Sequence, residues 1–152
     1  MEIGNPAPDF VMATDTAGEI SLKSLSGQKF VFYFYPKDDT PGCTKEAIGF
    51  TENAAEFEKL GVRVIGVSKD TVAKHGKFRT KHNLSVLLAS DEDGATCEAY
   101  GVWVEKNMYG RKYMGIERAT FLVDGSGIVR TIWRKVKVKG HVDAVLTAAA
   151  DL

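Results

Sequence analysis

The sequence contains only two cysteines among its 152 residues, which excludes a fold built on a disulfide framework. Cys43 and Cys97 are too far apart to form a CxxC redox pair, and single thiols persist best in a reducing compartment. No apolar run approaches the length of a membrane span, and the first residues lack the basic and apolar segments of a signal peptide. We therefore expect a cytoplasmic protein with no membrane partner.

An excess of either charge is absent as well. Lysine and arginine together number 20, as do aspartate and glutamate, so the formal net charge is zero. This balance gives no support for nucleic acid as a partner. His75 and His82 do not have the i, i+4 spacing of a helical metal pair, and His141 is remote from both. We interpret all three histidines as surface residues, and we expect neither a metal nor an organic cofactor.

Internal repeats and linker-like stretches are also missing, so we expect one domain over residues 1–152, and a monomer rather than a dimer. Hydrophobic residues make up 44% of the chain, which is enough for a core without disulfides. Their spacing predicts a short hairpin, then β-α-β-α-β, then β-β-α. The expected strands are 10–13, 19–22, 30–35, 62–68, 85–89, 102–104, 111–116, 118–123 and 128–134, and the expected helices are 43–59, 71–81 and 140–152.

This order of elements indicates the fold class. The β-α-β-α-β part implies parallel strands joined by right-handed crossovers, and the later strands add an antiparallel part. One mixed central sheet with helices on both faces satisfies both requirements. The sequence therefore predicts an α/β fold of thioredoxin-like architecture, because that architecture has the same order of elements.

The stretch around Cys43 carries the clearest chemical signal. Cys43 follows the buried strand 30–35 and falls in the first turn of the helix that comes next. A helix N-terminus has a partial positive charge and unpaired N–H groups, and both stabilise a thiolate over a thiol. We therefore interpret Cys43 as a nucleophile.

Residues near Cys43 match what a thiol needs to reduce a peroxide. Gly42 lets the backbone approach a ligand closely, Thr40 offers a hydroxyl, and Pro36 ends the strand with an apolar ring that can shield the sulfur. The leaving oxygen also needs a positive partner, which this stretch lacks. Arg118, at the start of a later strand, is the candidate because a guanidinium is always charged and offers forked donors.

The pattern Pro36-x-x-x-Thr40-x-x-Cys43 resembles the active-site segment of peroxiredoxins, above all the bacterioferritin comigratory protein or peroxiredoxin Q branch. The resemblance extends over nearly the whole chain, with further matches at 7–10, 90–94, 100–103 and 115–124. It implies a thioredoxin-like fold and the reduction of hydrogen peroxide and organic hydroperoxides, with thioredoxin, glutaredoxin or glutathione as the thiol reductant. By position, it makes Cys43 the peroxidatic cysteine, Thr40 and Pro36 the residues that shape its pocket, and Arg118 the site arginine.

The sequence departs from this family at the resolving cysteine. Many members carry a second cysteine five residues after the first, where this chain has Ile48, and others carry it near the position of Arg79. We therefore expect an external thiol, or Cys97, to reduce the sulfenic acid formed on Cys43.

Simpler interpretations of the same residues remain open. Cys97 reads more readily as a small core residue than as a resolving thiol. For Thr40, Pro36 and Arg118 the alternatives are a helix cap, a strand terminator and a surface strand residue paired with Glu117 or another carboxylate, but the resemblance favours the site role for all three.

Two stretches of the chain are rich in charged residues. We interpret residues 37–39 as a solvated loop, and 134–139 as a lysine-guarded sheet edge rather than a patch for an anionic partner.

The alternative to an enzyme is a non-catalytic thioredoxin-like module that senses oxidants or binds partners through modification of Cys43. Such a module needs neither Thr40 nor Arg118.

Overall fold

The densest apolar run of the chain forms an interior strand, β3 (Lys29–Phe34), in a computed structural model that describes residues 1–152. Successive side chains of a strand point to opposite faces of its sheet. Phe30, Phe32 and Phe34 accordingly enter one hydrophobic core, whereas Val31 and Tyr33 enter the other. Burial on both faces explains why this stretch is apolar throughout rather than alternating.

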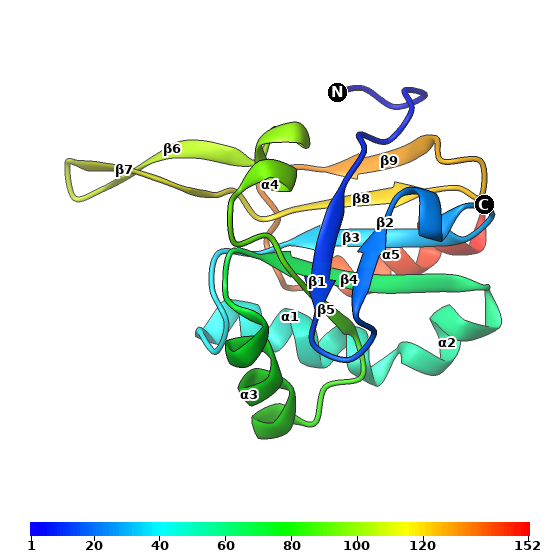
Figure 1. Ribbon diagram of the computed structural model, residues 1–152, viewed down its shortest axis with the longest axis horizontal. Coiled ribbons are helices and arrows are strands. Elements are labelled where there is room, and N and C mark those ends of the chain that lie inside the picture. Colours follow the sequence, from blue (N-terminus) through cyan, green and yellow to red (C-terminus); the bar gives the residue numbers. More distant parts are fainter.

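The central sheet has seven strands in the order β2-β1-β5-β4-β3-β8-β9 (Figure 1). Strands β3, β4 and β5 run parallel, and β1, β2, β8 and β9 extend the sheet with antiparallel pairs. The predicted mixed sheet is therefore confirmed. Besides β3, the strands are β1 (Val11–Thr14), β2 (Glu19–Ser21), β4 (Val62–Ser68), β5 (Leu87–Ser90), β8 (Ala119–Val123) and β9 (Val129–Trp133).

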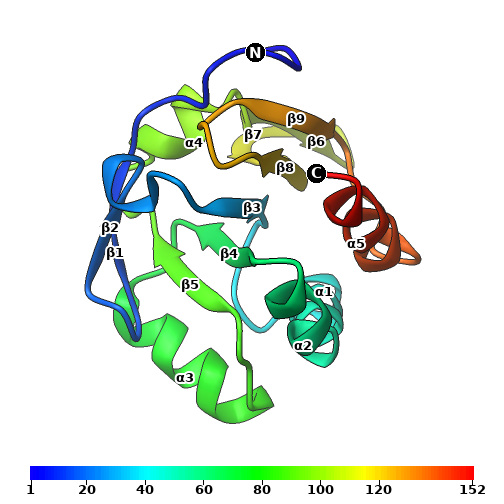
Figure 2. The same cartoon turned by 90° about the vertical axis from the view of Figure 1, so that its right-hand side faces the viewer.

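Helices cover the two faces of this sheet unequally (Figure 2). The face of Val31 and Tyr33 packs against residues of four helices, and the other face packs against the N-terminal segment and two short helices. The first group is α1 (Pro41–Glu52), α2 (Ala54–Lys59), α3 (Val72–His82) and α5 (His141–Ala150), and the second is η1 (Lys23–Leu25) and α4 (Ala95–Ala99). The single helix expected over 43–59 is in fact two, because the chain leaves helical geometry at Asn53.

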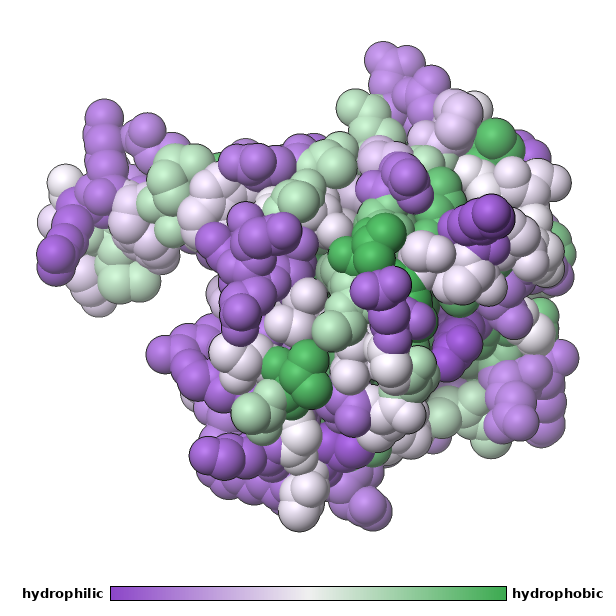
Figure 3. Space-filling view, viewed as in Figure 1, coloured by the Kyte–Doolittle hydropathy of each residue, from purple (hydrophilic) through white to green (hydrophobic).

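A two-stranded hairpin, β6 (Trp103–Met108) and β7 (Arg111–Ile116), stands away from the body of the molecule (Figure 1). The space-filling view shows the same projection, with hydrophilic and hydrophobic residues mixed over this side of the protein (Figure 3). The strand expected over 102–104 is therefore longer than predicted. No helix is both long and apolar enough to cross a membrane.

The stretch 134–139 is not a sheet edge, contrary to the prediction. Strand β9 ends at Trp133, and Lys135 has a left-handed φ of 48° that a strand cannot continue through. Arg134 instead binds the carboxylate of Glu117, and the amide of Val136 donates to the carbonyl of Arg118 at 2.9 Å. The alternating lysines thus belong to a loop that is hydrogen-bonded to Glu117 and Arg118.

Two of the three histidines are buried, so the prediction of surface histidines is wrong for them. The His75 side chain has no exposed area, and His141 is 6% exposed. Each has a polar partner that a sequence pattern does not reveal, and for His141 it is the hydroxyl of Thr120 at 2.8 Å from Nε2. Burial, assisted by the positive charge of Arg118, lowers the pKa of His141 to about 4.

Acidification should therefore destabilise the protein through His141. The unfolded chain binds a proton at this residue near pH 6.5, and the folded chain only near 4, so stability falls by about 3 kcal/mol as the pH drops between these values. We expect His141→Asn to lose less stability than the wild type when urea unfolding is measured at pH 6.5 and 4.5. The exposed-site variant His82→Asn serves as the control and should keep the wild-type acid sensitivity. Equal losses in wild type and His141→Asn would contradict this assignment.

Candidate active site

Cys43 lies in the first turn of α1, just beyond the end of β3, as predicted. Thr40 is the N-cap residue with an extended backbone, and Pro41 opens the helix, where its missing N–H costs nothing. The first helical bond runs from the amide of Thr44 to the carbonyl of Thr40, so the amide N–H of Cys43 has no acceptor in the protein. The cysteine is only 1% exposed. Its sulfur therefore lies at the positive end of a helix, largely shielded from water.

Arg118 reaches the sulfur from a distant part of the chain. Its Nη2 atom lies 3.3 Å from the Sγ atom of Cys43. The register of β3 against β8 explains this contact, because Phe34 pairs with Ala119 and the residue before Ala119 therefore lies beside the end of β3. The predicted proximity of Arg118 to Cys43 is thus confirmed. Arg118 does pair with a carboxylate, but the partner is the buried Glu46 and not Glu117, which binds Arg134, and the Arg118 side chain is only 17% exposed.

Glu46 is a member of this site that the sequence analysis missed. Its Oε1 atom accepts from Nη1 of Arg118 at 2.8 Å, and its side chain is fully buried. Burial raises the pKa of Glu46 to about 7, although the charge of Arg118 acts in the opposite direction. Its i, i+3 spacing from Cys43 is the signal that could have revealed it, because such residues share one face of a helix.

The guanidinium consequently bridges a carboxyl group and a sulfur. Burial works against the charge of Arg118, but Glu46 and then Cys43 raise the pKa of the guanidinium, so it stays cationic. The same cation lowers the pKa of Lys106 on β6, second to burial. Lys106, near the middle of β6, therefore lies within range of the charge of Arg118.

The sequence predicts that the backbone at Gly42 approaches a ligand closely. In the structure, the group close to Gly42 is the side chain of Arg118. A Cβ atom at this position would lie 3.1 Å from Nη2 of Arg118. The missing side chain thus leaves room for the guanidinium beside Cys43.

Thr40 occupies the N-cap position, as its alternative interpretation has it, but its side chain makes no capping hydrogen bond. Its Oγ1 atom donates to the carbonyl of Lys37 at 2.9 Å. With its proton committed in this way, the hydroxyl oxygen is left to act as an acceptor toward a ligand.

Pro36 directly follows β3 and is exposed. Cys97 is fully buried and belongs to the hydrophobic core on the other face of the sheet from Cys43. Burial, followed by the hydrogen bond and charge of Asp91, raises the pKa of the Cys97 thiol far above its usual value. Both observations agree with its interpretation as a core residue.

The loop 37–39 is only partly solvated. Asp38 is buried, contrary to the prediction, and its carboxylate binds Tyr35 and His75. Asp39 is exposed, as predicted, and forms surface contacts with Lys81 and His82.

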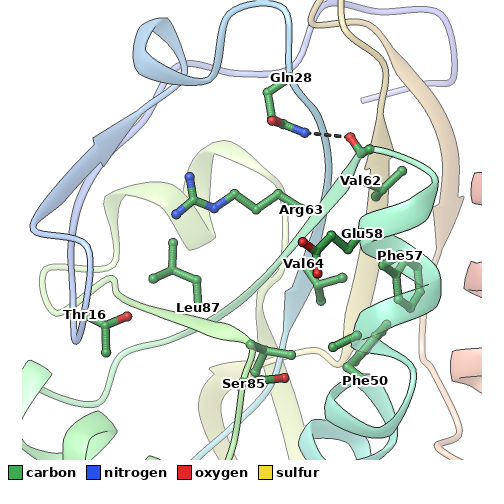
Figure 4. Close-up of a pocket in the computed structure, with 13 residues that line it drawn as sticks. Thr16, Gln28, Phe50, Phe57, Glu58, Val62, Arg63, Val64, Ser85 and Leu87 are labelled. Carbon is green, nitrogen blue, oxygen red and sulfur yellow. Dashed lines mark hydrogen bonds between the residues drawn. The ribbon is translucent and has the colours of Figure 1, made fainter.

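An open pocket of about 560 Å³ lies elsewhere, near the start of β4 and β5 (Figure 4). Arg63, Leu87 and Phe50 are among the residues that line it, and Gln28 donates to the carbonyl of Gly61 at its rim. Cys43 lies beyond the opposite end of these parallel strands. This pocket is therefore remote from Cys43.

Comparison with known proteins identifies the family. Residues 3–132 match the AhpC/TSA family, and the chain therefore belongs to this family. It is 52% identical to a Bcp-type peroxiredoxin of Coxiella burnetii over 146 residues, which cover 96% of this chain and 97% of that protein. It is 47% identical to peroxiredoxin Bcp of Bacillus subtilis over 152 residues, which cover 100% of this chain and 97% of the relative.

Solved structures agree with these relatives. Xanthomonas campestris peroxiredoxin Q superposes with a TM-score of 0.91 at 44% identity, with 99% of this chain and 96% of that chain covered. The resemblance to the peroxiredoxin Q branch and the thioredoxin-like fold are thus confirmed, and so is the activity class of a peroxidase that uses thiols. In the site described above, the sulfur of Cys43 and the guanidinium of Arg118 are in contact.

Gly42→Ala should slow the reaction of Cys43 with hydrogen peroxide. The new methyl group would push the guanidinium by a few tenths of an ångström, and we expect the second-order rate constant to fall about threefold to tenfold. Stopped-flow measurement of tryptophan fluorescence after mixing with peroxide would give this rate constant.

Gly76→Ala is a matched control for this prediction. Gly76 lies in α3, where an added Cβ atom has no neighbour within 4 Å, so the same substitution should leave the rate constant unchanged. Equal effects of the two substitutions would show that the close approach to Arg118 does not matter.

Proposed function

We propose that this protein reduces hydrogen peroxide and organic hydroperoxides through a sulfenic acid formed on Cys43. The observation that carries the proposal is the 3.3 Å contact between Nη2 of Arg118 and the sulfur, at the start of α1. A module that only binds partners through Cys43 needs no buried cation held against its thiol by a second buried residue, Glu46. This geometry and the likeness to Bcp peroxiredoxins together favour an enzyme over the non-catalytic alternative.

In the oxidative step, the Cys43 thiolate attacks one oxygen of the peroxide, and a sulfur–oxygen bond forms as the oxygen–oxygen bond breaks. The sulfur is oxidised by two electrons, and the leaving oxygen departs as hydroxide or alkoxide and takes up a proton to give water or an alcohol. Arg118 and the free amide N–H of Cys43 are the donors that can stabilise the developing negative charge. Thr40, whose own proton is committed to Lys37, can accept from the peroxide O–H and orient it.

The reductive step belongs, in this proposal, to an external thiol. Ile48 and Arg79 occupy the two usual resolving positions, and Cys97 lies on the far side of the central sheet. A disulfide requires two Cα atoms within about 7 Å of each other, which a sheet between the two cysteines prevents without unfolding. An external thiol would displace water from the sulfenic acid to form a mixed disulfide. A second thiol would then release Cys43 and leave as the oxidised disulfide product.

The substrate and partner assignments follow the same proposal. A structure of the Xanthomonas campestris bacterioferritin comigratory protein, 43% identical to this chain with a TM-score of 0.90, is described in terms of alkyl peroxide reduction. This likeness supports organic hydroperoxides as substrates of the present chain. Thioredoxin, glutaredoxin and glutathione are the candidate reductants, and we propose that the enzyme acts as a cytoplasmic monomer.

Loss of the Cys43 sulfur or of the Arg118 guanidinium should stop or slow the oxidative step, whereas loss of a surface arginine should not. Cys43→Ser should abolish peroxide consumption, because no other thiol is accessible. Arg118→Ala should lower the second-order rate constant by about 100-fold or more, since a charged donor at the reacting atoms is lost. The control is Arg130→Ala, which breaks only a surface contact with Asp124 and should react at the wild-type rate. Full activity of Cys43→Ser would overturn the proposed function.

Intact mass spectrometry tests the one-cysteine route. After one equivalent of peroxide and no added thiol, we expect the protein to gain one oxygen atom, which peptide mapping should place on Cys43. The Cys97→Ser variant should give the same product and the same turnover with an external thiol. Loss of two hydrogens and a Cys43–Cys97 peptide would instead make Cys97 the resolving cysteine.

A further inference from the structure

We propose that His75 is a positioning residue for Cys43, which holds the β3–α1 connection in its reactive shape through a buried ion pair with Asp38. This inference rests on the proposed function, since it concerns the geometry of the peroxide reaction. His75 belongs to α3 and makes no contact with Cys43 itself. Its role would be exerted through the loop that leads into α1.

Both ring nitrogens of His75 face acceptors. Nδ1 lies 2.6 Å from a carboxylate oxygen of Asp38, and Nε2 lies 2.9 Å from the carbonyl oxygen of Ala89. A carbonyl can only accept, so Nε2 carries a proton, and the carboxylate is satisfied best if Nδ1 carries one too. Burial opposes a charged ring, but the hydrogen bond and charge of Asp38 outweigh it and raise the pKa of His75. The pair is therefore an imidazolium bound to a carboxylate.

Asp38 connects this pair to the reactive segment. Its second carboxylate oxygen accepts from the hydroxyl of Tyr35 at 2.6 Å, and its amide donates to Asp70 at 2.8 Å. The preceding carbonyl, that of Lys37, is the acceptor that orients the hydroxyl of Thr40. Fixing Asp38 thus fixes the peptide unit that aims Thr40.

The loop needs such a restraint, because its backbone is strained. Asp39, between Asp38 and Thr40, has a φ of 60°, a left-handed conformation that residues other than glycine adopt at a cost. The contacts of Asp39 with Lys81 and His82 are exposed, and exposed ion pairs contribute little. The buried pair one residue earlier is the stronger restraint.

The partner helix is itself firmly anchored. Arg79, one turn after His75 in α3, binds the carboxylate of Asp15 and the carbonyls of Leu84 and Val86. The second ring nitrogen of His75 also ties it to β5 through Ala89. The ion pair therefore joins the loop before Cys43 to a part of the molecule that cannot move with it.

Stability alone does not account for this pair. Two charges taken out of water lose more hydration energy than a simple contact restores, so a buried ion pair is often no more stabilising than apolar residues of the same volume. A buried pair does, however, hold a specific geometry, and here that geometry includes the segment that surrounds the thiol. This makes positioning the better explanation of the pair.

The test compares two histidines of the same helix that face the same loop. His75→Phe removes the buried pair and keeps the ring volume, whereas His82→Phe removes the exposed contact with Asp39. We expect the second-order rate constant for oxidation by hydrogen peroxide to fall about tenfold or more in His75→Phe and less than about twofold in His82→Phe. Alkylation of Cys43 by iodoacetamide, which needs no oriented peroxide, should not slow in parallel in His75→Phe.

Asp38→Asn keeps the shape of the loop and gives a second measurement, should His75→Phe fold poorly. We expect the same defect with peroxide, and faster amide hydrogen exchange confined to residues 36–42. If the folded variants oxidise at the wild-type rate, or if peroxide oxidation and alkylation slow equally, His75 is not a positioning residue. If the wild type itself does not consume peroxide, the proposed function fails, which is a separate and recognisable outcome.

Discussion

The guanidinium of Arg118 is the group on which the rest of the site depends. It lies 2.8 Å from a carboxylate oxygen of Glu46 and 3.3 Å from the sulfur of Cys43, in surroundings that exclude most water. Opposite charges attract strongly in such a medium, and a single charge there is poorly tolerated. Glu46 therefore holds the cation against the sulfur, and the missing side chain of Gly42 leaves the space that the guanidinium occupies.

The central sheet turns this local arrangement into a defined site. Pairing of β3 with β8 brings Arg118 to the end of β3, where the chain leaves the sheet and enters α1. The same sheet separates Cys43 from Cys97, because the two cysteines belong to cores on opposite faces. The central sheet thus brings together the residues for the oxidative half of the proposed reaction, and it separates Cys43 from Cys97, the internal candidate for the reductive half. In this proposal, the topology of the sheet calls for an external thiol as much as the residues at position 48 and near position 79 do.

Hydrophobic periodicity predicted most strands and helices to within two residues, because burial of apolar side chains dominates the choice of local structure. The errors at the buried histidines and at residues 134–139 have a common origin in polar contacts between distant segments. His75 and His141 are polar in sequence but buried, since Asp38 and Thr120 satisfy them. The segment 134–139 alternates like a strand, yet its contacts with Glu117 and Arg118 draw it off the sheet. A one-dimensional pattern carries no information about such partners.

The family and the fold class follow from the sequence alone, and the sequence also predicts Cys43 as the nucleophile and Arg118 as its matching cation. These are encoded in a short specific motif and in apolar spacing, both of which are local. Three further facts depend on the tertiary structure: Glu46 holds Arg118, the Thr40 hydroxyl donates to the carbonyl of Lys37 and accepts no bond from the helix, and Cys97 lies on the other face of the sheet from Cys43. Each of these facts depends on which side chains meet after folding, and on the cost of leaving a buried polar group without a partner. Asp38, in the stretch before Cys43, shows the difference. Its sequence context predicts a solvated charge, whereas in the folded protein its carboxylate binds Tyr35 and His75.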